Sequence, residues 1–163
     1  MAKVSLRPIT PENLDECISL KVANHQKGFV APNIYSLAQA SVSPTYHPCG
    51  IYDADAHYQA NPSMVGFVMY GLSNARGFIL RLMIDEKFQR RGYGRAAMVE
   101  VVRRLKLHPE VERIATSHDR KNEAAARLYE SLGFIDWKHE SRTDDSGERY
   151  LILQEDNANW TEE

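Results

Sequence analysis

The spacing of apolar and polar residues along the chain predicts a succession of short strands and helices. Residues 4–9 predict a strand, after which Thr10 as a cap and Pro11 at the first helical position predict a helix to about Ala23. One face of this helix carries apolar residues at i, i+3 and i+4 spacing. They are Leu14, Cys17, Ile18 and Val22. A second short helix is predicted at residues 36–42.

The middle of the chain predicts a meander of three antiparallel strands. Residues 50–52 and 64–72 are strand-like and flank a long polar connection at residues 53–63. A turn at residues 73–77 leads into a further strand at residues 78–84.

The last part of the chain returns to a helical pattern. Helices are predicted at residues 94–108 and 123–132, the second of them closed by Gly133. Strands are predicted at residues 113–117, 134–140 and 148–153, with a turn at 144–147 and a polar tail at 156–163. The predicted order is therefore β-α-α-β-β-β-α-β-α-β-β, and the length predicts one domain spanning residues 1–163.

Composition and charge narrow the class of protein. The chain is 43% hydrophobic and 26% charged, which is typical of a folded globular domain. Its formal net charge of -2 provides no global positive field, so no nucleic-acid partner is expected. Cys17 and Cys49 lack zinc-site spacing and predict no metal site and no disulfide, but reduced thiols in the cytosol. Prolines interrupt the uncharged stretch at residues 28–52, so no membrane segment is expected.

One segment has the components of an anion-binding loop. It lies between a predicted strand and a predicted helix, whose N-terminus adds partial positive charge. Its residues are Gln89, Arg90, Arg91, Gly92, Tyr93, Gly94 and Arg95. Glycines let backbone N–H groups approach phosphate oxygens, and arginines add charge-assisted contacts. The sequence has no P-loop motif, and the dinucleotide fingerprint fails because Asp85 to Arg91 separate the strand from Gly92.

A second group of residues lies on the helix predicted after this loop. Asn122 and Tyr129 stand two helical turns apart on one face, with small alanines between them that leave room for a thin ligand. Tyr129 also has a packing interpretation, because a Schellman closure at Gly133 would bring Phe134 against its ring.

Together these motifs resemble the GCN5-related N-acetyltransferase (GNAT) family. The resemblance rests on Gln89-x-x-Gly92-x-Gly94, on Asn122-x-x-Ala125-x-x-x-Tyr129-x-x-x-Gly133-Phe134 and on the element order, so it covers nearly the whole chain. It implies an α/β (α+β) fold with a mixed, mostly antiparallel sheet of roughly six to seven strands flanked by about four helices. It also implies acetyl-CoA as the donor, with its pantetheine arm along Leu82, Met83 and Ile84 and its pyrophosphate at residues 89–95.

The resemblance also implies roles for individual residues. Tyr129 is expected to donate a proton to the departing thiolate, and Asn122 to orient the cofactor. A backbone N–H in residues 82–84 is expected to polarise the thioester carbonyl. Residues 78–82 contain no acid, although some family members carry one there, and Arg81 is expected to form a salt bridge within the fold. The general base is left open among three histidines, His25, His47 and His118.

Segments in the first half resemble the bacterial spermine, spermidine or diamine acetyltransferases. These segments are residues 29–33, 36–38 and 66–71. A small diamine or polyamine is therefore expected to bind between residues 29–40 and the strand that contains Tyr70. Its expected contacts are Phe29, Asn33, Tyr35, Ser36 and Tyr70. Two alternatives stay open, an acetyltransferase for protein or peptide amino groups and a non-catalytic acyl-CoA-binding domain. A cytoplasmic location is expected, and a homodimer stays open.

Overall fold

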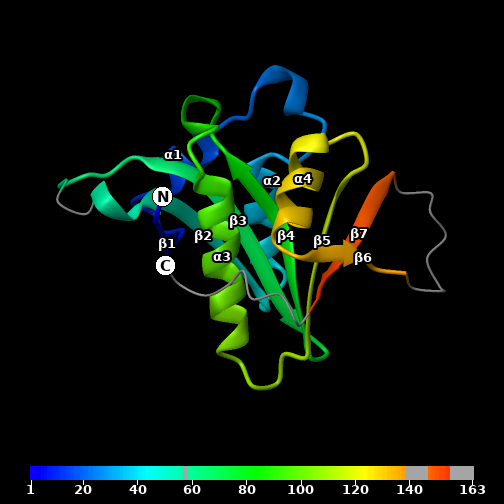
Figure 1. The fold of residues 1–163 in the computed structure, drawn as a ribbon. Helices are drawn as coiled ribbons and strands as arrows, with labels where there is room; N and C mark the ends of the chain where they lie inside the picture. Colours follow the sequence, from blue (N-terminus) through cyan, green and yellow to red (C-terminus); the bar gives the residue numbers. More distant parts are fainter. Residues whose placement is uncertain (57–58, 139–146, 155–163) are drawn as a thin grey trace.

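A single mixed sheet organises the computed structural model, which describes residues 1–56, 59–138 and 147–154 (Figure 1). Its strands are β1 (Val4–Pro8), β2 (Tyr46–Asp53), β3 (Met64–Ser73), β4 (Arg76–Ile84), β5 (Arg113–Asp119), β6 (Phe134–Asp136) and β7 (Glu148–Leu153). They form a seven-stranded sheet in the order β1-β2-β3-β4-β5-β7-β6. Neighbouring strands are antiparallel except β4 and β5, which are parallel. The predicted meander is confirmed as β2, β3 and β4.

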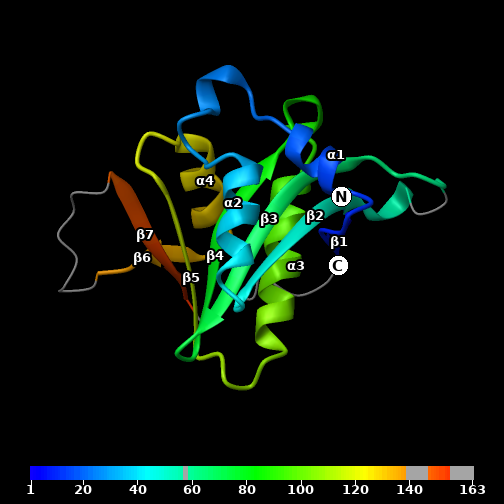
Figure 2. The same cartoon turned by 180° about the vertical axis from the view of Figure 1, so that it is seen from behind.

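Helices cover both faces of this sheet. They are α1 (Leu14–Ser19), α2 (Asn33–Ser41), α3 (Tyr93–Lys106) and α4 (Glu123–Ser131), with short 3-10 turns η1 (Asn24–Gln26), η2 (Ala54–Ala56) and η3 (Glu86–Phe88). Helices α3 and α4 lie on the face seen in Figure 1, and α1 and α2 lie on the opposite face, seen in Figure 2. The expected mixed sheet of six to seven strands with about four helices is therefore confirmed.

The sheet is buried on both faces at β3. Val68 and Tyr70 belong to the core that includes α3 and α4, whereas Phe67 and Met69 belong to the core under α1 and α2. Successive side chains of a strand point to opposite faces, so a strand covered on both sides has a continuous apolar run. This alternation decides which residues of β3 can reach a site on either face.

The N-terminal helix is shorter than predicted. It spans Leu14–Ser19 rather than continuing to Ala23, and of its predicted apolar stripe only Cys17 is fully buried, while Leu14 and Ile18 are 37% and 39% exposed. The backbone N–H of Lys21 donates to Asp85 Oδ2, and the Lys21 carbonyl accepts from the Glu86 N–H. These contacts with the end of β4 hold the chain extended where the helix would have continued.

Two further boundaries differ from the prediction, and some predicted segments lie outside the described residues. Helix α2 begins at Asn33, directly after Pro32, rather than at residue 36. Strand β2 extends over residues 46–53 because it pairs with both β1 and β3. The helices and strands predicted from residue 94 onward are confirmed to within a few residues. The far end of the strand predicted at 134–140, most of the turn predicted at 144–147 and the predicted tail fall outside the described ranges.

The cysteines and the apolarity of the helices bear on two predictions made from composition, free thiols and no membrane segment. Cys17 and Cys49 are both buried free thiols. Within residues 1–56, 59–138 and 147–154, no helix combines the length and apolarity that a membrane crossing requires.

Candidate active site

The site lies where the two parallel strands separate. Residues 76–79 of β4 pair with residues 113–116 of β5, and the strands diverge beyond Ile79 and Thr116, with α4 beside the opening (Figure 1). A register shift against β3 marks the same point, because Met69 faces Arg81 and Tyr70 faces Ile79. A cavity of about 1180 Å³ is lined by both diverging strands.

Most residues predicted to bind the cofactor line this cavity. They are Leu82, Met83, Ile84, Gln89, Arg90, Gly92, Tyr93, Gly94 and Asn122, together with Tyr129. Arg91 and Arg95 are not among the lining residues. The Arg91 guanidinium lies 5.7 Å from the centre of the Phe88 ring, and Arg95 Nη1 donates to Ser131 Oγ at 2.9 Å. Arg95 therefore connects α3 to α4.

The backbone of the predicted anion-binding loop has an unusual conformation. Arg90 and Gly92 both adopt positive φ, 62° and 86°, and Gly92 immediately precedes α3. Among the described residues, no side chain caps the N-terminus of α3. The N–H groups of a first helical turn have no partner within the helix, so this uncapped end favours an anion. Arg90 adds a guanidinium on the lining of the same cavity.

Side chains fix the loop to the rest of the fold. The Gln89 amide donates to Ile84 O at 3.0 Å and to Gln26 Oε1 at 2.8 Å. Asp85, only 2% exposed, accepts from the backbone N–H of Lys87 at 3.0 Å. Because these polar side chains are occupied within the protein, the loop offers a ligand mainly its backbone N–H groups and Arg90.

Helix α4 contributes two side chains to the cavity. Asn122 Oδ1 accepts from the Ala125 N–H at 3.2 Å and so caps the helix. Tyr129 is buried, with its ring centre 5.9 Å from that of Phe134, and Gly133 has a φ of 91°. The predicted packing contact between Tyr129 and Phe134 is therefore confirmed, and Tyr129 lines the cavity as well.

Burial changes the acidity of this tyrosine. Burial raises the pKa of Tyr129 to about 12, although a hydrogen bond with the Thr116 side chain acts in the opposite direction. Thr116 Oγ1 in turn donates to Ile79 O at 3.0 Å, at the point where β4 and β5 separate. The Tyr129 phenol is therefore protonated at neutral pH and held beside the cavity.

The three histidines considered as the general base differ in exposure and in their position relative to the cavity. His25 is exposed at the rim of the cavity, and His47 lies outside it with its ring 5.2 Å from that of Tyr70. His118 lines the cavity and is 6% exposed. Its Nδ1 lies 2.7 Å from Asp119 O, and since a carbonyl only accepts, Nδ1 carries the hydrogen. His118 Nε2 is buried with no hydrogen-bond partner in the described part of the chain.

The five expected acceptor contacts do not converge. Phe29 lines the cavity, but the other four residues do not. Asn33 Nδ2 donates to Cys17 O at 2.9 Å, Ser36 is buried, and Tyr35 is 58% exposed on α2.

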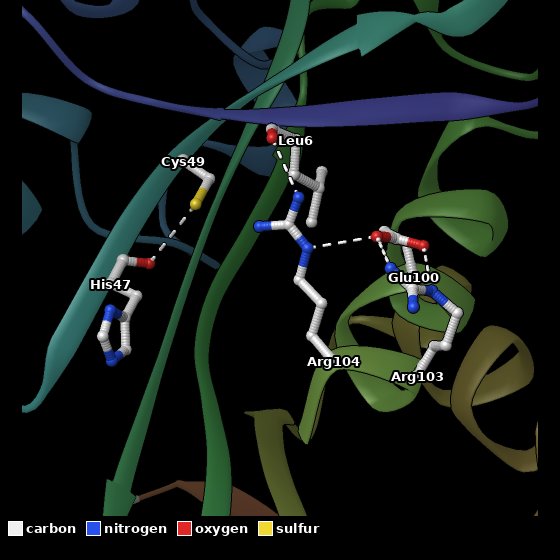
Figure 3. A network of polar contacts seen from close by, with 6 residues as sticks. All are labelled: Leu6, His47, Cys49, Glu100, Arg103 and Arg104. Carbon is white, nitrogen blue, oxygen red and sulfur yellow. Dashed lines mark hydrogen bonds and ion pairs between the residues drawn. The ribbon is translucent and has the colours of Figure 1, made fainter. Parts of the chain in front are cut away.

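Tyr70 lies on the opposite side of the sheet from α2. Its hydroxyl has a hydrogen bond with Arg104 of α3. Figure 3 shows Arg104 reaching the carbonyl of Leu6 on β1 while its Nε donates to Glu100. This network holds α3 on the sheet, so Tyr70 and the segment containing α2 do not form one pocket.

A carboxylate that the sequence did not indicate lines the cavity. Glu148 on β7 accepts from Ser117 Oγ on β5 at 2.7 Å, and both residues line the cavity together with Tyr150. The two residues are 31 positions apart in sequence, and β7 lies beside β5 in the sheet. The only sequence signal is an acid at the start of the last predicted strand.

The expected salt bridge of Arg81 is wrong. Arg81 donates to Leu80 O at 2.9 Å and to Gln39 Oε1 at 3.2 Å, and the ion pairs of the described residues do not include it. Its partner on α2 is an amide, and Arg81 also lines the cavity. Within the described residues no cluster of potential metal ligands was found.

A mixed sheet whose parallel strands part around a cavity, with an uncapped helix N-terminus at one end, suits a protein that binds a long ligand with an anionic end. Residues 34–134 match the Acetyltransferase (GNAT) family, and the chain belongs to this family. It is an acetyl-CoA-dependent N-acetyltransferase, which confirms the resemblance drawn from the motifs.

Individual proteins resemble the chain over nearly its whole length. It is 27% identical to a spermine/spermidine N(1)-acetyltransferase of Bacillus subtilis (strain 168), covering 93% of this chain and 98% of that one. A domain from Methanocaldococcus jannaschii DSM 2661 has a TM-score of 0.73 at 19% identity, covering 94% and 99%. Spermidine N-acetyltransferase from Vibrio cholerae, in complex with CoA and spermine, has a TM-score of 0.67 at 15% identity, covering 92% and 93%. The two structures establish a likeness of fold.

The residues of the cavity fit acetyl-CoA. The uncapped start of α3 and Arg90 suit its phosphates, and the diverging strands leave one edge of β4 open to its arm. When bound, the cofactor supplies an acetyl group activated as a thioester.

Proposed function

We propose that the chain acetylates a small primary amine of the diamine or polyamine kind. The observation that carries this substrate class is Glu148, a carboxylate on the cavity lining that Ser117 orients. A carboxylate forms charge-assisted hydrogen bonds with an ammonium group. The name of the Bacillus subtilis relative supports the same class of acceptor.

Two groups of residues hold the donor in this proposal. Backbone groups of Leu82, Met83 and Ile84 bind the arm, because β4 has no strand partner on its β5 side beyond Ile79. The N–H groups at the start of α3 and the Arg90 guanidinium bind the pyrophosphate. Asn122 contributes through α4, whose first turn it caps at the cavity wall.

Tyr129 acts as the general acid. Its phenol remains protonated through the physiological range, because burial raises its pKa to about 12. The ammonium first loses one proton to solvent. As the neutral amine nitrogen then bonds to the acetyl carbon, the carbon–sulfur bond breaks and Tyr129 gives its hydroxyl proton to the sulfur, while the proton that the nitrogen releases on becoming an amide restores the phenol by way of solvent. A thiol has a lower ordinary pKa, about 8.5, than a phenol, about 10, so this transfer is uphill by itself and proceeds together with the loss of the amine proton.

The amine is recognised on the side of β5 opposite to the one that Tyr129 faces. Ser117 precedes His118 in the strand and so points away from the face that carries Thr116 and His118. Glu148 and Ser117 therefore hold the ammonium on one side while Tyr129 serves the sulfur from the other. Phe29 contributes an apolar wall suited to an alkyl chain.

A kinetic panel tests this function. Release of the CoA thiol is measured with putrescine, spermidine, spermine, an amino acid and a peptide with a free amino terminus. We expect the diamine and polyamines to be turned over fastest, and Glu148→Gln to raise their KM about tenfold while acetyl-CoA affinity is retained, as for loss of one charge-assisted contact. Glu123→Gln is the matched control, because Glu123 lines the same cavity from the exposed start of α4.

Two results would contradict this proposal and assign the chain another function. Faster turnover of the peptide would make the chain an acetyltransferase of protein or peptide amino groups, and binding without thiol release for any amine would make it a non-catalytic acyl-CoA-binding domain. A cytoplasmic location belongs to the same proposal, since both cysteines are free thiols, the state favoured in a reducing compartment.

A further inference from the structure

We propose that Gln26 is a positioning residue through which occupation of the donor loop by CoA fixes the wall on which the amine binds. The donor loop is residues 89–95, and the acceptor segment is residues 22–31, which contains η1 and Phe29. This role rests on the proposed function, which places the CoA pyrophosphate at the donor loop and the alkyl chain of the amine against Phe29.

The donor loop and the acceptor segment are joined at two points, although they are far apart in sequence. At the first, the Lys21 N–H donates to Asp85 Oδ2 at 3.0 Å and the Lys21 carbonyl accepts from the Glu86 N–H at 2.9 Å, which fixes the start of the segment. At the second, Gln89 Nε2 donates to Gln26 Oε1 at 2.8 Å across 63 positions of sequence. Gln26 and Gln89 both line the cavity, so the second point is a side-chain link at the cavity itself.

Backbone partners fix the orientation of both side-chain amides. Ile84 O lies 3.0 Å from the Gln89 amide and can only accept, so Gln89 presents its nitrogen. The Ala23 N–H lies 3.2 Å from the Gln26 amide and can only donate, so Gln26 presents its oxygen. The two hydrogens of the Gln89 amide are thus both in use. The link between Gln26 and Gln89 therefore has one arrangement, set by groups that cannot change roles.

The backbone of Gln26 continues the link to Phe29. The Gln26 N–H donates to Ala23 O at 2.9 Å, and the Gln26 carbonyl accepts from the Phe29 N–H at 2.9 Å. Gln26 therefore holds the turn with its backbone and the donor loop with its side chain. Phe29 is half-buried and lines the cavity, so a shift of Gln26 moves the wall proposed for the alkyl chain.

The donor loop has a backbone conformation that outside contacts must support. Arg90, directly after Gln89, has a φ of 62°, which residues other than glycine rarely adopt. An anion on the N–H groups at the start of α3 and the anchor at Gln89 both favour this conformation. Two interactions that select the same state strengthen each other reciprocally. CoA is therefore expected to tighten the link between Gln89 and Gln26 and to order the acceptor segment.

Trypsin measures the order of the acceptor segment without any amine. Lys27 and Gly28 are both exposed, and the bond between them is the cleavage site. Mass spectrometry follows its cleavage relative to cleavage after Lys106, at the end of α3 and outside the large cavity, so that overall stabilisation by the ligand cancels. Saturating CoA is expected to slow the relative cleavage after Lys27 about threefold to tenfold in the wild type, the effect of one hydrogen bond.

Four variants isolate the side-chain link. Gln26→Ala and Gln89→Met share only the loss of this link, and the protection by CoA is expected to be lost in both. Gln26→Glu keeps an oxygen that accepts from Gln89 and from the Ala23 N–H, so protection is expected to remain. Asn24→Ala is the matched control, because Asn24 lies in the same turn, is exposed, and contacts the Lys27 N–H through its backbone carbonyl. It is expected to behave as the wild type.

Steady-state kinetics separate this role from a general loss of folding. Gln26→Ala is expected to raise the KM of spermidine about threefold to tenfold, while kcat at saturating amine is retained because Tyr129 is unchanged. In Gln26→Glu the KM is expected at or below the wild-type value, because the link is kept and the added carboxylate attracts a polyamine.

Any of three results overturns the inference. Undiminished protection by CoA in Gln26→Ala would mean that the ligand acts on the acceptor segment directly. Loss of protection in Gln26→Glu as in Gln26→Ala would show that an acceptor oxygen at this position does not form the link. Loss of protection in Asn24→Ala would assign the effect to the turn as a whole. The protease measurement uses no amine, so a failure of the amine panel leaves its outcome unchanged and the two proposals fail separately.

Discussion

Tyr93, the first residue of α3, donates its phenolic hydrogen to Asp53 Oδ2 at the end of β2 across 2.5 Å. The contact joins residues 40 positions apart and fixes the start of α3 to the sheet. The hydrogen bond to this carboxylate is the main reason that the pKa of Tyr93 lies above its ordinary value. The start of α3 is the end that carries the uncapped N–H groups, so its position depends on a partner outside the loop.

Tyr93→Phe is expected to lower stability without changing the fold. The hydrogen bond is partly exposed, so its loss should cost about 1 kcal/mol and lower Tm by about 2 to 4 °C for a chain of this size. Thermal unfolding followed by circular dichroism measures the change. The double variant Tyr93→Phe/Asp53→Ala should be no less stable than Asp53→Ala alone. Additive losses would contradict a direct interaction between the two side chains.

Gly94→Val is expected to weaken acetyl-CoA binding in a folded protein. A Cβ at Gly94 would lie 3.7 Å from Leu128 Cδ2 and 3.8 Å from Ile84 Cγ1, which are ordinary contacts, so the helix tolerates it. The added side chain would enter the space used by the cofactor and reduce affinity about tenfold or more, equivalent to about 1.4 kcal/mol. Gly28→Val, elsewhere on the lining of the same cavity and with nothing within 4 Å of its added Cβ, tests whether a valine at any point of the lining has the same effect. Unchanged affinity in Gly94→Val would remove the loop from the binding site.

Tyr129→Phe is expected to reduce kcat by about 10² to 10⁴ while cofactor affinity is kept, because a positioned proton donor is lost. Steady-state thiol release and calorimetry provide the two measurements. Tyr46→Phe, on β2 outside the cavity, is the matched control and should retain turnover. A Tyr129→Phe protein with wild-type kcat would leave Tyr129 only its packing contact with Phe134.

The raised pKa of Tyr129 predicts that the folded protein loses stability at alkaline pH. In the unfolded chain its phenol ionises near pH 10, whereas in the fold its pKa is raised to about 12. The stability that this group contributes is present below the unfolded pKa and lost as pH rises through the folded one, because the unfolded state releases its proton first. The two-unit difference corresponds to about 3 kcal/mol between pH 10 and 12.

Urea unfolding at a series of pH values checks this prediction. The unfolding free energy of the wild type should fall more steeply above pH 10 than that of Tyr129→Phe, which has no phenol at this position. Parallel curves for the two proteins would mean that the phenol is accessible to solvent in the fold.

Some site residues could be predicted from short windows of sequence. The loop at residues 89–95 and the helix that carries Asn122 and Tyr129 depend on glycines, caps and helical spacing within a few positions. The contact between Tyr129 and Phe134 was also predictable, because a helix C-terminus is a local motif. By contrast, the N-terminal helix ended early since Asp85, far along the chain, bonds the backbone of Lys21.

Tertiary structure decided which face and which neighbour each side chain has. Tyr70 lies on a strand whose sequence suited a binding site. Strand alternation and Arg104 nevertheless place its side chain on the face of the sheet that α3 covers. Glu148 meets Ser117 only because the sheet order inserts β7 beside β5. Among three histidines equal in sequence terms, packing alone placed His118 in a buried position on the lining of the cavity. Local conformation depends on the nearest residues, so the sequence determined the elements and the two motifs, whereas contacts across strands depend on the order of the sheet, which only the folded chain establishes.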